Sequence, residues 1–170
     1  MVNGNTTTGS KKFYGKYQGV VTDNRDPKFL GRIRAKVPSV LGDEELGWAL
    51  PCVPYAGKNV GMLFIPPVDS DVWIEFQDGD IKKPICSGCF WSHFGLPGLN
   101  TDPDIKIIKT EHATITINDK SGENKIEIKT LKDQKIVMKP DSTEIYHDGC
   151  SVKLTSREVS INGTNLQVKK

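Results

Sequence analysis

No run of eighteen apolar residues occurs in this 170-residue sequence, so no segment has the composition of a membrane-spanning helix. The first twelve residues, MVNGNTTTGSKK, also lack the apolar core of a secretory signal peptide. We therefore expect a protein that is made in the cytoplasm without a signal peptide. If it leaves the cell, another route must export it.

The sequence motifs of common catalytic sites are missing as well. There is no nucleophile elbow, no phosphate-binding glycine loop and no HExxH. Carboxylates such as Asp69 and Asp71 fall in expected turns, whereas a glycosidase needs a cleft that separates the pKa values of two carboxyl groups. We therefore predict no enzymatic activity, no cofactor and no metal site.

Cysteine is scarce, with four residues in the chain. Cys86 and Cys89 have the CxxC spacing of a zinc half-site or a redox motif. A structural zinc site needs two more ligands, and there is no second CxxC and no HxxxH. Gly88 and the aromatic residues after Cys89 disfavour the helix of a thioredoxin-like motif. Structural thiols are therefore the favoured interpretation, and a metal or redox role is the alternative.

An excess of basic residues is also absent. The net charge is +2, and basic and acidic residues are nearly balanced in both halves of the chain. Proteins that bind nucleic acid usually carry a basic surface that neutralises phosphates. We therefore predict no nucleic-acid partner.

The residue composition changes along the chain and divides it into four parts. Residues 1–12 are polar, and we expect them to be flexible. Residues 13–95 contain longer apolar runs, all three tryptophans and many Gly/Pro/Asp turns, a pattern typical of a small all-β barrel. Residues 96–104 resemble a linker, and residues 105–170 form a repetitive tail. The strands expected in the barrel are 13–21, 31–37, 48–54, 60–65, 72–77 and 85–91, with one possible helical turn at 41–46.

The tail contains pairs of apolar residues that flank a single residue and recur about every ten residues or fewer. Period two indicates short strands with one buried face. Turn residues such as Asp148-Gly149 and Asn162-Gly163 lie between the pairs. The pairs, predicted to form the core, are Ile115/Ile117, Ile126/Ile128, Ile136/Met138, Val152/Leu154, Val159/Ile161 and Leu166/Val168.

Such short repeats cannot enclose a core within one chain. A single-chain β-solenoid needs about twenty residues per coil, whereas each unit here supplies roughly one face. Three chains around a common axis would supply the missing faces, so the repeat length predicts a stacked, trimeric β-solenoid. A single-chain antiparallel meander is the alternative, because Asp148-Gly149 and Asn162-Gly163 also suit hairpin turns.

The barrel segment resembles a known family. The resemblance covers about residues 13–95 and lies in the order and spacing of several motifs rather than in any one of them. The motifs are GVVTDNRDP (19–27), LGRIRAKVP (30–38), WALP (48–51), AG (56–57), FIPP (64–67), VWIEF (72–76), GD (79–80) and PICSG (84–88). This ordered series resembles the OB-fold domain of central spike proteins of contractile injection machines, namely baseplate assembly protein V, the T4-like spike and VgrG spikes.

This resemblance implies an OB-fold barrel followed by an intertwined trimeric β-helix. Residues 91–104 leave no room for the lysozyme domain of T4-like spikes, and the dozen residues before the barrel imply a hub on a separate polypeptide. Family members often have glycine where this chain has Asp69, and we expect the turn there to survive because aspartate tolerates turn conformations.

Partner contacts are also implied by the resemblance. His93, His112 and His147 are scattered and do not form the His-x-His iron motif of some spike tips. A separate PAAR-like tip protein is therefore expected. The predicted tip seat is Val168, Lys169 and Lys170. The basic stripe of the second strand supplies hub-facing candidates, with a solvated strand face as the alternative: Arg32, Arg34 and Lys36.

These inferences together predict a structural spike. It would sit in a virion baseplate, a secretion system or an extracellular injection particle, dock on a hub, and pierce the target envelope with transient membrane contact. The alternative is a monomeric OB-fold module that binds single-stranded nucleic acid or a glycan. Exposed aromatic side chains would then stack on the ligand. The candidates are Trp73, Phe90, Trp91 and Phe94.

Overall fold

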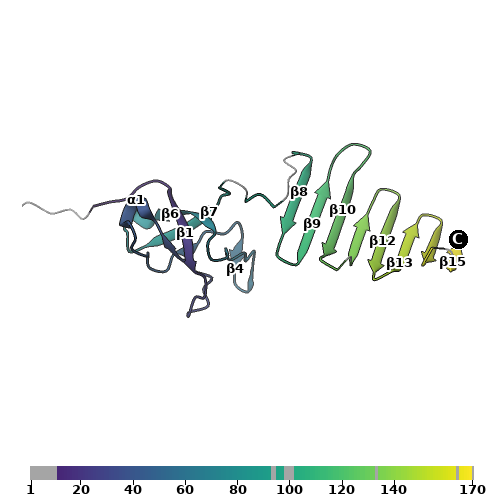
Figure 1. Ribbon diagram of the computed structural model, residues 1–170, viewed down its shortest axis with the longest axis horizontal. Coiled ribbons are helices and arrows are strands. Elements are labelled where there is room, and N and C mark those ends of the chain that lie inside the picture. The colour runs from purple at the N-terminus through teal and green to yellow at the C-terminus, as the bar shows by residue number, and fades with distance from the viewer. Residues whose placement is uncertain (1–10, 93–94, 98–101, 133, 164, 170) are drawn as a thin grey trace, which may run out of the picture. The chain divides into compact units, whose positions relative to one another are not determined.

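The computed structural model describes residues 11–92, 95–97, 102–132, 134–163 and 165–169. The chain divides into two compact units, residues 1–95 and 96–170, and the regular elements described in both are almost all strands (Figure 1). Within the described residues, no helix has the length and apolar character needed to cross a membrane. Except for its last two residues, the segment 1–12 lies outside the described part.

The first unit is built on a five-stranded sheet in the order β2-β1-β6-β7-β3, in which all neighbours are antiparallel except β3 and β7. A separate hairpin pairs β4 with β5. The bounds are β1 (Tyr17–Asp23), β2 (Arg34–Lys36), β3 (Leu50–Pro51), β4 (Ala56–Gly57), β5 (Val60–Gly61), β6 (Asp71–Phe76) and β7 (Pro84–Cys89), with α1 (Pro38–Leu41) after β2 and the 3-10 helix η1 (Gln77–Gly79) after β6.

The sheet closes on itself to form a barrel. Ile33, just before β2, exchanges two backbone hydrogen bonds of 3.2 and 2.8 Å with Ala49, just before β3. This bridge joins the two outer strands of the sheet. Alternate residues of β6 point inward, as period two requires, so Val72 and Ile74 are fully buried. The barrel encloses the main hydrophobic core: Val21, Ile33, Ala35, Val37, Leu46, Ala49, Val72, Ile74, Phe76 and Cys86.

Several expected elements are shorter or displaced in the structure. The strand expected over 60–65 is limited to Val60–Gly61, and the run 48–54 forms a strand only at Leu50–Pro51. Proline cannot donate to a ladder, which limits pairing around Pro51. The helical turn lies at Pro38–Leu41 rather than 41–46, because Pro38 is pre-organised for a first helical position.

Asp69 adopts the backbone conformation that glycine prefers. Its φ is +68°, and its N–H donates to the carbonyl of Val21 at 3.0 Å, so the turn before β6 forms with aspartate in place. Aspartate enters this left-handed region more easily than β-branched residues do.

The turn at Asp69 therefore gives a testable expectation for the stability of the barrel. Asp69→Val should lower the free energy of unfolding by about 1–2 kcal/mol. Asp69→Gly should stay within about 0.5 kcal/mol of the wild type, because lower strain offsets the greater entropy of the unfolded chain. Denaturant unfolding measures both values. Equal losses in the two variants would show that the positive φ does not limit this position.

The second unit is an antiparallel meander of eight strands, each paired with its neighbours in sequence (Figure 1). The order is β15-β14-β13-β12-β11-β10-β9-β8. The strands are β8 (Ile105–Lys109), β9 (Ala113–Asn118), β10 (Lys125–Thr130), β11 (Lys135–Met138), β12 (Ser142–His147), β13 (Cys150–Thr155), β14 (Glu158–Ile161) and β15 (Leu166–Lys169).

Tight turns set the register of this meander. Asp148 and Gly149 connect β12 to β13 with φ values of 45° and 82°, as a two-residue hairpin of type I′ requires. Asn162 and Gly163 have the same pattern after β14, with φ values of 48° and 69°. The strand ladders between described residues therefore run within one chain. Within one chain the tail is thus an antiparallel meander, which the turn residues also permitted.

Candidate functional site

Apolar side chains line one face of the meander in two continuous rows. Residues directly opposite each other in an antiparallel pair project from the same face, so the register identifies each row. The first row is Ile108, Ile115, Ile128, Ile136, Ile145, Val152, Ile161 and Leu166. The second row is Lys106, Ile117, Ile126, Met138, Thr143, Leu154, Val159 and Val168.

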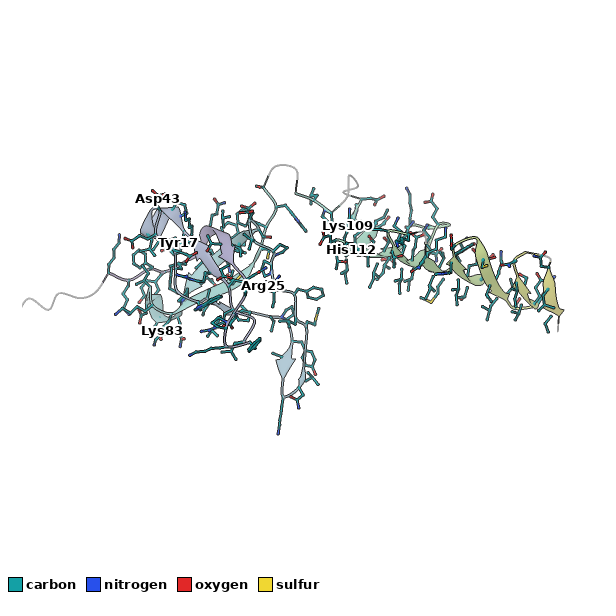
Figure 2. The ribbon with its side chains drawn as sticks, turned by 60° about the horizontal axis from the view of Figure 1, so that its bottom comes forward. Tyr17, Arg25, Asp43, Lys83, Lys109 and His112 are labelled. Atoms are coloured by element: carbon teal, nitrogen blue, oxygen red, sulfur yellow. The ribbon has the colours of Figure 1, made fainter. Side chains whose placement is uncertain are left out.

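These two rows, here called the apolar face, are not covered by anything in the described chain. Most of their apolar side chains are between 36% (Ile115) and 62% (Val168) exposed, and Val152 is half-buried. Figure 2 shows side chains projecting from the sheet without a second layer over them. Among the described residues of this unit, the only buried apolar side chain is Val137, which projects from the opposite face. The unit has no hydrophobic core of its own.

The opposite face is polar and internally paired. Its central row contains Glu127, Val137, Glu144 and Lys153 as successive cross-strand partners. Lys153 Nζ lies 3.0 Å from a Glu144 carboxylate oxygen, and the Tyr146 hydroxyl donates to the same carboxylate. These two donors lower the pKa of Glu144, with the hydrogen bond from Tyr146 as the larger cause. The two faces thus differ sharply, and only the apolar one requires a partner.

The energetic demand of the apolar face can be estimated. Fully burying an aliphatic side chain contributes about 1.5–3 kcal/mol, so covering the remaining exposed fraction is worth about 1 kcal/mol per residue. Over the face this sums to on the order of 10 kcal/mol per chain. Two apolar rows left uncovered over eight strands would also present an exposed patch larger than monomeric proteins usually tolerate.

All twelve residues predicted as core lie on this face, and the structure aligns them into the two rows. Sequence analysis missed Ile108 and Ile145. Ile145 was missed because its partner position on β12 is Thr143, which breaks the apolar pair. Ile108 was missed because Lys106 replaces the expected second apolar residue of β8. A search that allowed one polar member per pair would have found both.

The predicted tip seat lies at the free edge of the meander. β15 is the last strand, and Val168 is the most exposed residue of the apolar face. Lys169 ends β15, and Lys170 lies outside the described residues.

The hub-facing candidates have different surroundings in the barrel. Arg32 forms a bidentate pair with Asp26, with Nε–Oδ2 and Nη2–Oδ1 distances of 3.0 and 2.6 Å, and its side chain is only 14% exposed. Its guanidinium also lies 5.5 Å from the ring centroid of Trp48. Arg34 pairs with Glu45 at 2.6 Å and stays partly exposed, while Lys36 is exposed.

Asp26 organises the turn between β1 and β2. Besides Arg32, its carboxylate accepts backbone N–H groups of Lys28 and Leu30, each at 2.9 Å, and of Arg32 at 3.3 Å. The guanidinium of Arg32, followed by these backbone donors, holds the pKa of Asp26 well below its usual range. Arg32 therefore serves the fold of the barrel, whereas Arg34, although paired with Glu45, and Lys36 both reach solvent.

The aromatic residues that could stack on a ligand differ in how they are packed. The Trp73 and Phe90 rings pack together with centroids 4.6 Å apart. Trp91 is exposed, and Phe94 lies outside the described residues.

The cysteines are all free thiols. Burial raises the pKa of the Cys86 thiol and also that of Cys89, which favours the protonated over the nucleophilic form. Among the described residues, no group of three His, Cys, Asp or Glu side chains is arranged to hold a metal ion.

Two family models match the two units. Residues 17–91 match the type VI secretion system/phage-baseplate injector OB domain, and residues 105–167 match the phage baseplate V C-terminal trimerisation domain. Over 113 residues the chain is 28% identical to the type VI secretion system spike protein VgrG1b of Pseudomonas aeruginosa. That match covers 59% of this chain and 15% of the relative, so the chain corresponds to a small part of it.

The order of the matched domains is the order of the structure, a five-stranded barrel followed by a sheet with one uncovered apolar face. A trimerisation domain also accounts for an apolar face that one chain leaves uncovered. The chain belongs to the family of phage baseplate V and VgrG-type spike proteins, components of baseplates and type VI secretion systems.

Proposed function

We propose that three copies of this chain form the central spike of a contractile injection machine and pierce the target envelope. The apolar faces of the three sheets pack against one another around a common axis and create an intertwined β-helix. The observation that carries this proposal is the pair of uncovered rows, which run without interruption by charge from β9 to β15. One chain supplies one side of the spike, and three chains enclose a dry core.

The mechanical role follows from how such an assembly resists deformation. Each strand is bonded to its neighbours along the sheet, and the two-residue turn at Asp148-Gly149 leaves little slack between β12 and β13. Three sheets closed around an apolar core leave few free edges. Contraction of a sheath would drive this rigid body forward, with only transient membrane contact and no chemical step.

We assign docking on a separate hub protein to the barrel. Arg34 and Lys36 lie on β2, an outer strand of the sheet, and both reach solvent. Charges at the rim of an interface mainly set association rate and register. The hub surface that meets β2 should therefore be acidic.

The free edge of β15 provides the seat for a tip protein of the PAAR-like class. An unpaired edge strand with exposed Leu166 and Val168 is a ready surface for another chain. Removing residues 167–170 should therefore abolish binding of the tip protein and leave the trimer intact. Co-purification with the tip protein measures this, and unchanged binding would remove β15 as the seat.

The piercing role can be tested in producing cells. Particles that carry Val152→Asp should assemble without a folded spike and fail to breach target cells. Ser151→Asp, on the neighbouring position but the polar face, should give particles of normal activity. Normal delivery by Val152→Asp particles that lack the spike would overturn the piercing role.

A further inference from the structure

An apolar segment stands out on the barrel itself. The β4–β5 hairpin and the residues after it, together residues 55–65 and here called the apolar segment, expose large side chains. Leu63 is 68% and Phe64 is 64% exposed. On its inner side the segment rests on the barrel, because a side chain at Gly31 would meet Leu63 Cδ1 at 3.2 Å. The exposed members are Tyr55, Val60, Met62, Leu63, Phe64 and Ile65.

The backbone of the same segment lacks partners. Sequence periodicity predicts a strand over 60–65, but pairing ends where the N–H of Met62 donates to the carbonyl of Tyr55 at 2.9 Å. Among the described residues, the N–H groups of Leu63, Phe64 and Ile65 have no backbone acceptor. An extended, apolar stretch with free donors is the usual template for pairing with another chain.

The charge pattern fits a protein interface. No charged residue occurs between Lys58 and Asp69. Cores of protein–protein interfaces are depleted in charge and enriched in Phe, Tyr and Met. A two-stranded hairpin is marginally stable by itself, so β4 and β5 also gain from being covered.

The trimer supplies the partner. Residues 90–104 connect β7 to β8, and at about 3.5 Å per residue they hold each barrel within about 50 Å of its own sheet. Three chains joined through their trimerisation domains therefore keep three barrels together at an effective concentration in the millimolar range. Copies of the chain are therefore available to this apolar surface at a high local concentration.

We propose that the apolar segment of each chain packs against a neighbouring chain of the same trimer and forms a second interchain contact. Leu63, Phe64 and Ile65 make this contact, and their free N–H groups find acceptors on the neighbour. This inference rests on the trimeric state proposed above. The trimer would then be held by two interchain contacts, one between the apolar faces of the sheets and one made by the apolar segment of each barrel.

Photo-crosslinking tests the proposal on the full-length protein. Phe64→benzoylphenylalanine should give covalent dimers and trimers on irradiation, at least about tenfold more than a control position. Asp43→benzoylphenylalanine is the control, because Asp43 is exposed and lies across the barrel from the β4–β5 hairpin (Figure 2). Trimers that give only intrachain products from position 64, or equal yields from both positions, would overturn the proposal.

Failure of the barrel contact can be distinguished from failure of the proposed trimer, because light scattering on the same samples gives the mass of the assembly. A monomer would overturn both proposals, whereas a trimer without crosslinks would overturn only the barrel contact. Hydrogen exchange provides a second readout in the unmodified trimer. The amides of Leu63, Phe64 and Ile65 should exchange at least about tenfold more slowly than free amides, and exchange at the free rate would contradict the contact.

Discussion

Val152→Asp should convert the trimer into monomers. Val152 lies in the middle of the first apolar row, with Ile145 and Ile161 as its cross-strand partners. In the trimer three carboxylates would be buried in one apolar core, and leaving a charge buried without a partner typically costs about 3–5 kcal/mol each. This cost exceeds the roughly 1 kcal/mol that burying any one side chain of the apolar face contributes. Size exclusion with light scattering measures the change in mass.

Ser151→Asp is the matched control. Ser151 precedes Val152 on β13 and projects from the polar face opposite Tyr146. The added carboxylate stays in water there, so the trimer should persist. Ile161→Asp should behave like Val152→Asp. Stable trimers of either apolar-face variant, or monomers of Ser151→Asp, would show that the interface has been placed on the wrong face.

Asp26→Asn should produce the second large effect, a marked loss of barrel stability. The amide nitrogen of asparagine cannot accept a hydrogen bond, so it cannot replace the oxygen that Arg32 and the backbone donors share. The guanidinium of Arg32 would remain largely buried without its counter-charge. Denaturant unfolding of the barrel at neutral pH measures the loss, while the mass of the trimer should not change.

A solvent-exposed ion pair in the same barrel supplies the control. Lys16 and Glu75 lie 3.2 Å apart and both are well exposed, so Glu75→Gln should cost about 0–1 kcal/mol. Asp26→Asn should cost several times as much. Equal effects of the two substitutions would mean that Asp26 is an ordinary surface residue.

The pKa of Asp26 also gives a pH dependence. Because this pKa is lowered in the folded protein, the stability it contributes is present above the unfolded value of 3.8. That contribution is lost as the pH falls from about 3.8 through the folded value, since the unfolded chain binds a proton first. The slope of stability against pH below 3.8 should be shallower in Asp26→Asn. Identical slopes would contradict the lowered pKa.

Period two in the sequence identifies which tail residues share one face of the sheet, because strand periodicity is a local property. Pairs such as Ile126/Ile128 and Val159/Ile161 indicate that shared face without knowledge of the partner strands, and their burial in a trimer core stays a prediction. Pairing between strands is not local, which is why the ladder within one chain and the contribution of Ile145 emerged only from the register.

The barrel shows a different limit of prediction. Alternation made Arg32 resemble an outward residue like Arg34, but it could not reveal that Asp26 captures the Arg32 guanidinium. Likewise, residues 60–65 have a strand pattern, yet a strand forms only where a partner lies within reach. Both differences come from long-range contacts that outweigh local preference.

The central claim is that three chains close their apolar faces into one spike. The absolute mass of the purified protein in solution, measured by light scattering after size exclusion, tests it most directly. We predict a species of about three times the 18.8 kDa of one chain that persists on dilution, because the apolar face of a single chain is uncovered. A stable, soluble monomer would contradict the claim.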